Sequence, residues 1–202
     1  MMVFPYPWNG LEEYLVEKSG GVLNLFSYGS LMNAYSSAVT LSEGGGMYPA
    51  IGYGFKRVFN YPMGAHAYER YGDPHAPDAT AALNAIPAAD ASSQINGLIK
   101  AIPLSDLENL RNREVNYELH EIVCTDWDTR RRIMDRVFVL SFADGASDIF
   151  PHPTYLQVCL EGANAISENF GYMFLTSTYL FDGTTTLDHW MKKTSEYHGN
   201  QL

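Results

Sequence analysis

The sequence predicts one α+β domain in which short strands form an antiparallel sheet curled towards a barrel, and helices follow in the last third. The chain of 202 residues has the length of one compact domain. Several short runs of apolar and β-branched residues are separated mostly by short turn-forming stretches, which favours antiparallel pairing over a parallel βαβ array. The last third changes to apolar residues at helical spacing.

The first residues predict a helical lead-in, residues 1–21, ahead of the main domain at 22–202. Asn9 and Glu12 have the spacing of a capping box at the start of this helix. The pair Gly20-Gly21 is expected to end it.

The strands and the later helices follow from the same patterns. A buried first strand ends where Gly29 interrupts it, and a helix that begins near Pro153 is expected to stop at Gly171. The expected strands are 22–28, 55–61, 80–86, 94–102, 117–125 and 132–142, and the expected C-terminal helices are 153–169 and 186–193.

Charge and cysteine content narrow the possible partners. The formal net charge of -10 and the pI of about 4.9 argue against binding to a phosphate backbone, so nucleic acid is not an expected partner. Cys124 and Cys159 are too few for a secreted disulfide framework and have no Cys-x-x-Cys spacing, so a reducing cytoplasm is expected. The N-terminus has neither a basic segment nor a long apolar run, and no membrane segment is expected.

A capped helix over residues 104–117 carries the most informative side chain. Ser105 and Glu108 have capping-box spacing, and the apolar stripe through Leu107 and Leu110 continues to Glu114. A carboxylate therefore falls on the inward face of the predicted helix.

Three interpretations of Glu114 remain open on the residues alone. The helix can end before it, leaving a solvated carboxylate or one paired with Arg111 or Arg113. A partly buried carboxylate, by contrast, has a raised pKa suited to general acid and base catalysis. A metal site is the third interpretation, but the sequence lacks a partner ligand set, and Glu118 with His120 is more typical of a strand edge than of a ligand pair.

Five stretches, taken in order, resemble the γ-glutamylcyclotransferase superfamily from about residue 23 to 190. They are LFSYGSLMN, GYGFKRVFNY, QINGLIKAI, SDLENLRNREVNY and PHPTYLQVCLEGA. The resemblance implies a small, mostly antiparallel barrel and no metal or organic cofactor. It also implies a reaction in which the α-amine of a small γ-glutamyl peptide or γ-glutamylamine attacks its own γ-carbonyl, releasing 5-oxoproline and the free amine or amino acid.

The resemblance also implies the site residues. Glu114 matches the catalytic carboxylate, acting as base and then as acid. The loop that holds the γ-glutamyl group matches Ser27, Tyr28, Gly29, Ser30 and Leu31, with backbone N–H groups that form a nest for an anion. Tyr117 and Tyr155 match less securely, as phenols aimed at the substrate or as core aromatic residues. The loop at 64–78 and the last helix are expected to border the leaving group.

Some features leave other functions open. Val115-Asn116 follows Glu114, where family helices often continue into a glycine. The same pocket suits amide hydrolysis by water, and the same fold suits a non-catalytic module that binds a metabolite or a protein partner. The aromatic residues in the segment 1–8 are then either a docking segment or part of the packed core.

Overall fold

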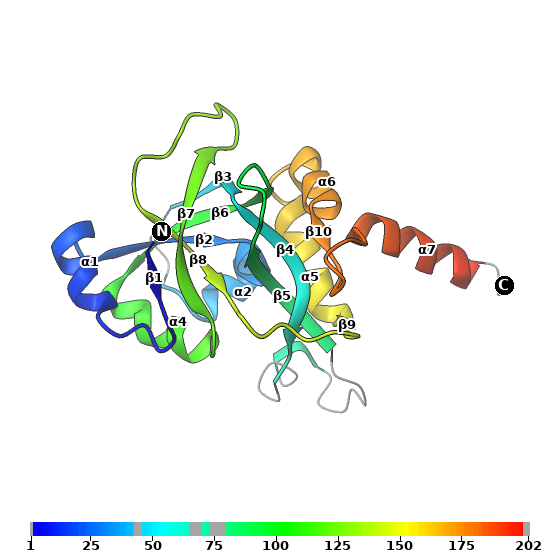
Figure 1. The fold of residues 1–202 in the computed structure, drawn as a ribbon, viewed down its shortest axis with the longest axis horizontal. Coiled ribbons are helices and arrows are strands. Elements are labelled where there is room, and N and C mark those ends of the chain that lie inside the picture. The colour runs from blue at the N-terminus through cyan, green and yellow to red at the C-terminus, as the bar shows by residue number, and fades with distance from the viewer. Residues whose placement is uncertain (1, 43–45, 65–69, 73–79, 200–202) are drawn as a thin grey trace.

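The computed structural model describes residues 2–42, 46–64, 70–72 and 80–199, and their fold is mixed α+β (Figure 1). The strands are β1 Val3–Phe4, β2 Val22–Ser27, β3 Met47–Tyr53, β4 Phe55–Pro62, β5 Thr80–Pro87, β6 Gln94–Pro103, β7 Glu118–Asp126, β8 Val137–Ser141, β9 Phe150–Pro151 and β10 Thr178–Tyr179. The helices are α1 Leu11–Ser19, α2 Ala34–Ala38, α4 Leu107–Arg113, α5 Pro153–Asn164, α6 Glu168–Thr176 and α7 Leu187–Gly199, with short 3-10 helices η1 Ser30–Met32 and η2 Leu104–Asp106.

The strands are divided between two sheets. The larger has six strands in the order β1-β7-β3-β6-β2-β8, and β7 also pairs with β8. The smaller has four strands in the order β10-β4-β5-β9. The expected α+β class and the predominance of antiparallel pairs are confirmed, whereas the single small barrel stays a prediction.

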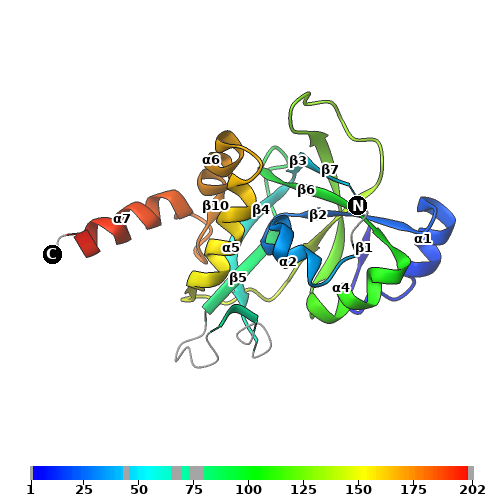
Figure 2. The ribbon, with the colours of Figure 1, turned by 180° about the vertical axis from the view of Figure 1, so that it is seen from behind.

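Helices cover the sheets at both ends of the molecule. α1 and α4 lie at one end, and α5 and α6 lie at the other, from which α7 projects outward (Figure 1). Seen from behind, α2 and α5 lie side by side where β2 ends (Figure 2). Asn33, which caps α2, donates from Nδ2 to the Val158 carbonyl of α5 at 3.4 Å. No helix in the described part of the chain combines the length and the apolar character needed to cross a membrane.

The predicted strands recur with shifted ends, but β3 and the two-residue strands β1, β9 and β10 were missed. β3 pairs with β6 along its whole length and with β7 over half of it, yet its sequence contains Pro49 and Gly52 and lacks clear alternation. This segment therefore becomes a strand because it pairs with β6 on one side and with β7 on the other, and no local sequence pattern indicates such pairing.

The prediction of one continuous helix over 153–169 was wrong after Asn164. α5 ends at Asn164, and α6 begins after Ser167, whose hydroxyl accepts from the Phe170 N–H at 3.2 Å. Gly171 lies inside α6 and does not stop a helix. A side chain there would collide with the Asn164 side chain, so Gly171 allows the two helices to approach closely.

Both predicted capping boxes were also wrong. The residue before α1 is Gly10 in the left-handed region, with φ of 78°, and Asn9 does not cap the helix. Ser105 lies within η2, and the neighbouring Asp106 carboxylate accepts from both the backbone N–H and the hydroxyl of Ser42 at 2.7 Å. The C-terminal end of α1 is as predicted, because Gly20 and Gly21 both adopt left-handed backbone angles there.

The N-terminal segment packs on the larger sheet. Val3 and Phe4 pair with β7. Trp8 is fully buried, and its indole Nε1 donates to the carbonyl of Tyr117 at 2.7 Å. Of the two interpretations of the aromatic N-terminus, the structure supports packing against the core, and it places Trp8 directly behind the backbone of a predicted site residue.

Arg57 joins the two sheets from the inside. It lies on β4 of the smaller sheet and is completely buried, with its guanidinium stacked 4.0 Å from the centre of the Phe174 ring. Its acceptors are Tyr28 O, Asn96 O, Asn96 Oδ1, Phe174 O, Ser177 Oγ and Thr178 Oγ1. Burial lowers the pKa of Arg57 to about 9, so the side chain is still a cation at neutral pH.

Replacing Arg57 should destabilise the fold more than replacing an exposed arginine. We expect Arg57→Met to lower the free energy of unfolding by about 3 kcal/mol or more, because several buried acceptors lose their donor. Arg136→Met is the matched control, since Arg136 forms an exposed ion pair with Glu121 and should cost less than about 1 kcal/mol. Urea unfolding of both variants measures the difference, and equal losses would contradict the assigned role.

Candidate active site

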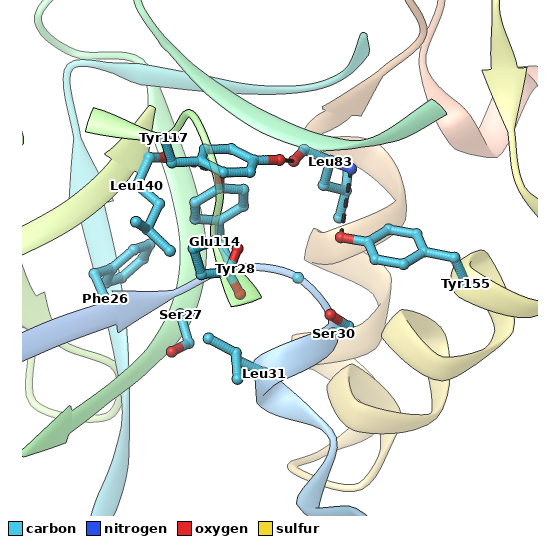
Figure 3. A pocket seen from close by; sticks show the side chains of 11 residues that line it. Phe26, Ser27, Tyr28, Ser30, Leu31, Leu83, Glu114, Tyr117, Leu140 and Tyr155 are labelled. Carbon is cyan, nitrogen blue, oxygen red and sulfur yellow. Dashed lines mark hydrogen bonds between the residues drawn. The ribbon is translucent and has the colours of Figure 1, made fainter. Parts of the chain in front are cut away.

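All the predicted site residues line one pocket (Figure 3). It lies where the end of β2 meets β5, β8, the C-terminal end of α4 and the first turn of α5. The lining residues are Phe26, Ser27, Tyr28, Gly29, Ser30, Leu31, Leu83, Glu114, Tyr117, Leu140 and Tyr155. The pocket therefore brings together residues more than a hundred positions apart in the sequence, such as Tyr28, Leu140 and Tyr155.

The floor of the pocket is the loop after β2. Ser30 begins η1, and no hydrogen bond from the backbone N–H of Ser30 or Leu31 is found within the described ranges. Successive unpaired N–H groups at the start of a turn suit an anion or a developing oxyanion. The buried hydroxyl of Ser27 likewise has no partner among the described residues.

Gly29 is required by a close contact and not by a left-handed turn. Its φ is −135°, which is outside the left-handed region. A Cβ at this position would lie 2.9 Å from the Tyr155 hydroxyl oxygen and 3.5 Å from Leu83 Cδ1. The absence of a side chain therefore lets the loop approach the phenol of α5.

Glu114 lies just past the end of α4, with φ of −99° and ψ of 51°, so the predicted helical stripe does not extend to it. Its side chain is only 15% exposed and Oε1 lies 3.0 Å from Arg113 Nε. The structure thus combines two of the interpretations: the helix ends before Glu114 and the carboxylate is paired, yet it is largely buried in the pocket. Asn116, two residues on, adopts φ of 70°, a left-handed angle that Asn tolerates.

Burial raises the pKa of Glu114 above its ordinary value, because desolvation penalises the carboxylate. The positive charges of Arg113 and Arg70 oppose this effect, and so does the hydrogen bond from Arg113, but desolvation prevails. A carboxyl group with a raised pKa is suited to both accepting and donating a proton near neutral pH.

Arg113 is fully engaged by the protein. Nη1 donates to the Ser36 carbonyl at 2.6 Å and to Thr40 Oγ1 at 2.7 Å. Nη2 donates to Ser30 Oγ at 3.1 Å and to Ser36 Oγ at 2.8 Å, while Nε faces Glu114. Arg113 therefore fixes Glu114 relative to the loop, and the Ser30 hydroxyl keeps its own proton available for a ligand.

The three tyrosine hydroxyls of the pocket are held by neighbouring strands. Tyr28 donates to the Leu140 carbonyl at 2.8 Å and accepts from the Ala85 N–H at 3.1 Å. Tyr117 donates to the Leu83 carbonyl at 2.7 Å, and Tyr155 accepts weakly from the Leu83 N–H at 3.4 Å. Burial raises the pKa of all three phenols well above the usual range, so they are neutral.

A second hollow adjoins the first. The sequence did not indicate that its lining residues lie together. It shares Ser30, Glu114, Tyr117 and Tyr155 with the first hollow, and its other lining residues are Tyr61, Met63, Gly64, Arg70, Tyr71, Ala82 and Arg113. The two hollows enclose about 320 and 510 Å³ of space outside the protein atoms, part of it open to solvent.

The predicted bordering loop at 64–78 is described only in part. Gly64, Arg70 and Tyr71 line the second hollow, whereas residues 65–69 and 73–79 lie outside the described ranges. α7, the last helix, contributes no described residue to either hollow.

The described residues give less support to a metal site or to a reactive cysteine. No group of three or more His, Cys, Asp or Glu side chains there has an arrangement that would hold a metal ion. Glu118 and His120 instead pair with each other at 2.9 Å. Cys124 and Cys159 are free and buried, and burial raises the pKa of each thiol to about 12, so both stay protonated at neutral pH.

The fold is that of the γ-glutamylcyclotransferase-like proteins, as the sequence motifs predicted. A solved structure described as a γ-glutamyl cyclotransferase superposes with a TM-score of 0.56 at 15% identity, over 76% of this chain and 86% of that one. An uncharacterized protein from Homo sapiens gives a TM-score of 0.57 at 15% identity, with the same coverage.

YkqA from Bacillus subtilis gives a TM-score of 0.59 at 17% identity, over 80% of this chain and 55% of that one, so this chain matches about half of that longer protein. No protein-family model and no curated protein sequence matches the chain. At these identities the likeness defines the fold, and the activity has to be argued from the site.

The contact between Gly29 and Tyr155 gives a test of the pocket geometry. We expect Gly29→Ala to cost about 1–3 kcal/mol of stability, because the new methyl group overlaps the phenol oxygen. The same change should cost clearly less in a Tyr155→Phe background, which removes that oxygen. Urea unfolding of the four proteins measures the coupling.

Gly46→Ala is the matched control, since a Cβ at Gly46 meets nothing within 4 Å. Its effect should be close to zero. A Gly29→Ala cost that is identical with and without the Tyr155 hydroxyl would show that the contact is not what requires glycine.

Proposed function

We propose that the protein is a γ-glutamylcyclotransferase-like enzyme that converts a small γ-glutamyl peptide or γ-glutamylamine into 5-oxoproline and the free amine or amino acid. The observation that carries the proposal is the position of Glu114. Its buried carboxylate lines both hollows and lies near the loop at Ser30 and Leu31, whose backbone N–H groups have no acceptor among the described residues (Figure 3). A proton-transferring group and an anion-binding loop thus flank one small space.

The reaction needs a folded substrate and two proton steps. The α-nitrogen attacks the γ-carbonyl carbon, a new C–N bond closes the five-membered ring, and the original amide C–N bond breaks. Glu114 takes a proton from the α-nitrogen as base and delivers a proton to the leaving nitrogen as acid. Its raised pKa narrows the energy gap between these two protonation states near neutral pH.

The loop after β2 has the complementary role. In this proposal the γ-glutamyl group occupies the first hollow, with the N–H groups of Ser30 and Leu31 as donors to its negatively charged oxygens. Tyr28 and Leu31 form the walls, and the hydroxyl of Ser30 adds a donor. The hydroxyls of Tyr28 and Tyr117 are already bonded to backbone groups, so we assign them to shaping the pocket. No cofactor is required for this chemistry.

Glu114→Gln should remove the activity and keep the fold. We expect at least a hundredfold loss of 5-oxoproline formation, because an amide cannot transfer the proton. The folded-state pKa of Glu114 is raised, so this group contributes stability at low pH that is lost as the pH rises through that pKa. The variant should therefore be at least as stable as wild type at pH 8.

Mass spectrometry of 5-oxoproline, with a panel of γ-glutamyl dipeptides, glutathione and γ-glutamylamines, measures the first effect, and urea unfolding measures the second. Free glutamate in place of 5-oxoproline would identify a hydrolase. A folded wild-type protein that binds panel members and turns over none would identify a binding module.

The pH profile gives an independent test of Glu114 as the base. Only its carboxylate form accepts a proton, so kcat/KM should rise with pH and level off above the pKa of Glu114 in the free enzyme. Because burial raises that pKa, the midpoint of the acid limb should lie above the ordinary value of a glutamate. A midpoint at or below the ordinary value, measured with the best panel substrate, would argue against a desolvated base.

A further inference from the structure

One cation that lines the second hollow, Arg70, has no bonding partner among the described residues. Among the described residues that line either hollow, the positively charged side chains are Arg70 and Arg113. Arg113 is bonded to α2, to Ser30 and to Glu114 through all of its nitrogens. Arg70 is exposed and has no hydrogen bond or ion pair with the described part of the chain. Its guanidinium is therefore available to a ligand.

Arg70 is close enough to Glu114 for its charge to act on the carboxyl group. Arg70 and Glu114 also line the same hollow, so a ligand part that extends from Glu114 into this hollow enters a space that Arg70 borders. A protein with a net charge of -10 repels anionic ligands at long range, and a cation inside the hollow offsets this repulsion locally. An arginine fork binds a carboxylate with two donors.

The remaining wall of the second hollow is aromatic and apolar. Tyr61 stacks on Tyr117 with ring centres 4.5 Å apart, and its hydroxyl is bonded to the Val115 carbonyl at 2.9 Å. The ring of Tyr71 packs edge-on against Tyr155 at 5.2 Å. With Met63 and Ala82, which are buried, these rings present carbon surface next to the guanidinium of Arg70.

We propose that this hollow binds a leaving group that carries a carboxylate and an apolar side chain, and that Arg70 selects it. The preferred substrates are then γ-glutamyl derivatives of apolar amino acids, and γ-glutamylamines without a carboxylate are disfavoured. The proposal rests on the proposed function only in placing the scissile nitrogen beside Glu114. Arg70 is a specificity residue, and the proton steps stay with Glu114.

The test uses two ligands that differ in one group. γ-Glutamyl-L-phenylalanine and γ-glutamylphenethylamine have the same aromatic side chain, and only the first has a carboxylate on the leaving group. Binding is measured by calorimetry in the Glu114→Gln background, where neither ligand is consumed, and 5-oxoproline formation is measured in the wild type. Arg70→Gln is the test variant, and Arg136→Gln, an exposed arginine outside both hollows, is its control.

We expect the carboxylate ligand to bind at least about tenfold more tightly than the amine, and Arg70→Gln to remove this preference by weakening only the carboxylate ligand. Arg136→Gln should leave both affinities unchanged. Equal weakening of the two ligands by Arg70→Gln would overturn the proposal, because Arg70 would then bind the α-carboxylate that both ligands share. A wild-type preference for the amine would also overturn it.

The calorimetric result does not depend on turnover, so the two proposals fail separately. Selective binding through Arg70 without 5-oxoproline from the wild type would reject the cyclotransferase reaction and retain the carboxylate subsite. Turnover of both ligands at equal efficiency, with equal binding, would retain the reaction and reject the subsite.

Discussion

Arg57 is a charge buried without any ionic partner among the described residues, and the arrangement of both sheets depends on satisfying it. A buried cation is costly unless each of its donors finds an acceptor. Carbonyls, hydroxyls and an amide from β6, β10, α6 and the end of β2 meet this requirement together. These segments are distant in sequence, so the guanidinium fixes their relative positions more strictly than apolar packing alone, which is not directional.

One of these acceptors connects the core to the candidate site. Arg57 Nη1 donates to the carbonyl of Tyr28, the residue directly before Gly29, at 3.2 Å. The Tyr28 side chain is fixed separately, because its hydroxyl bridges β5 and β8. With its backbone tied to the core and its side chain tied to both sheets, Tyr28 anchors the loop whose N–H groups face the pocket. A binding loop fixed in this way needs little ordering when a ligand arrives.

Sequence reasoning located most of the fold and the site, and its errors have physical causes. The loop at Tyr28 to Leu31 and the position of Glu114 follow from local motifs, and the structure places them in one pocket. β3, the break between α5 and α6, and the true partner of Asp106 depend on contacts between distant segments. The loop at 64–78 was expected to border the leaving group, but nothing in the sequence distinguished Arg70 within it, because an arginine in a polar loop is ordinary until the structure shows that it lines the same hollow as Glu114.

Glu114 illustrates how two opposing effects determine the chemistry of one carboxyl group. A glutamate paired with arginine ordinarily has a lowered pKa, and Arg113 lies within 3.0 Å of Oε1. Here Arg113 divides its remaining donors among Ser30, Ser36 and Thr40, while the surrounding pocket removes water from Glu114. Desolvation consequently outweighs pairing and the pKa is raised. The same arginine that orients the carboxylate thus leaves it basic enough to accept a proton, as a residue acting first as base and then as acid requires.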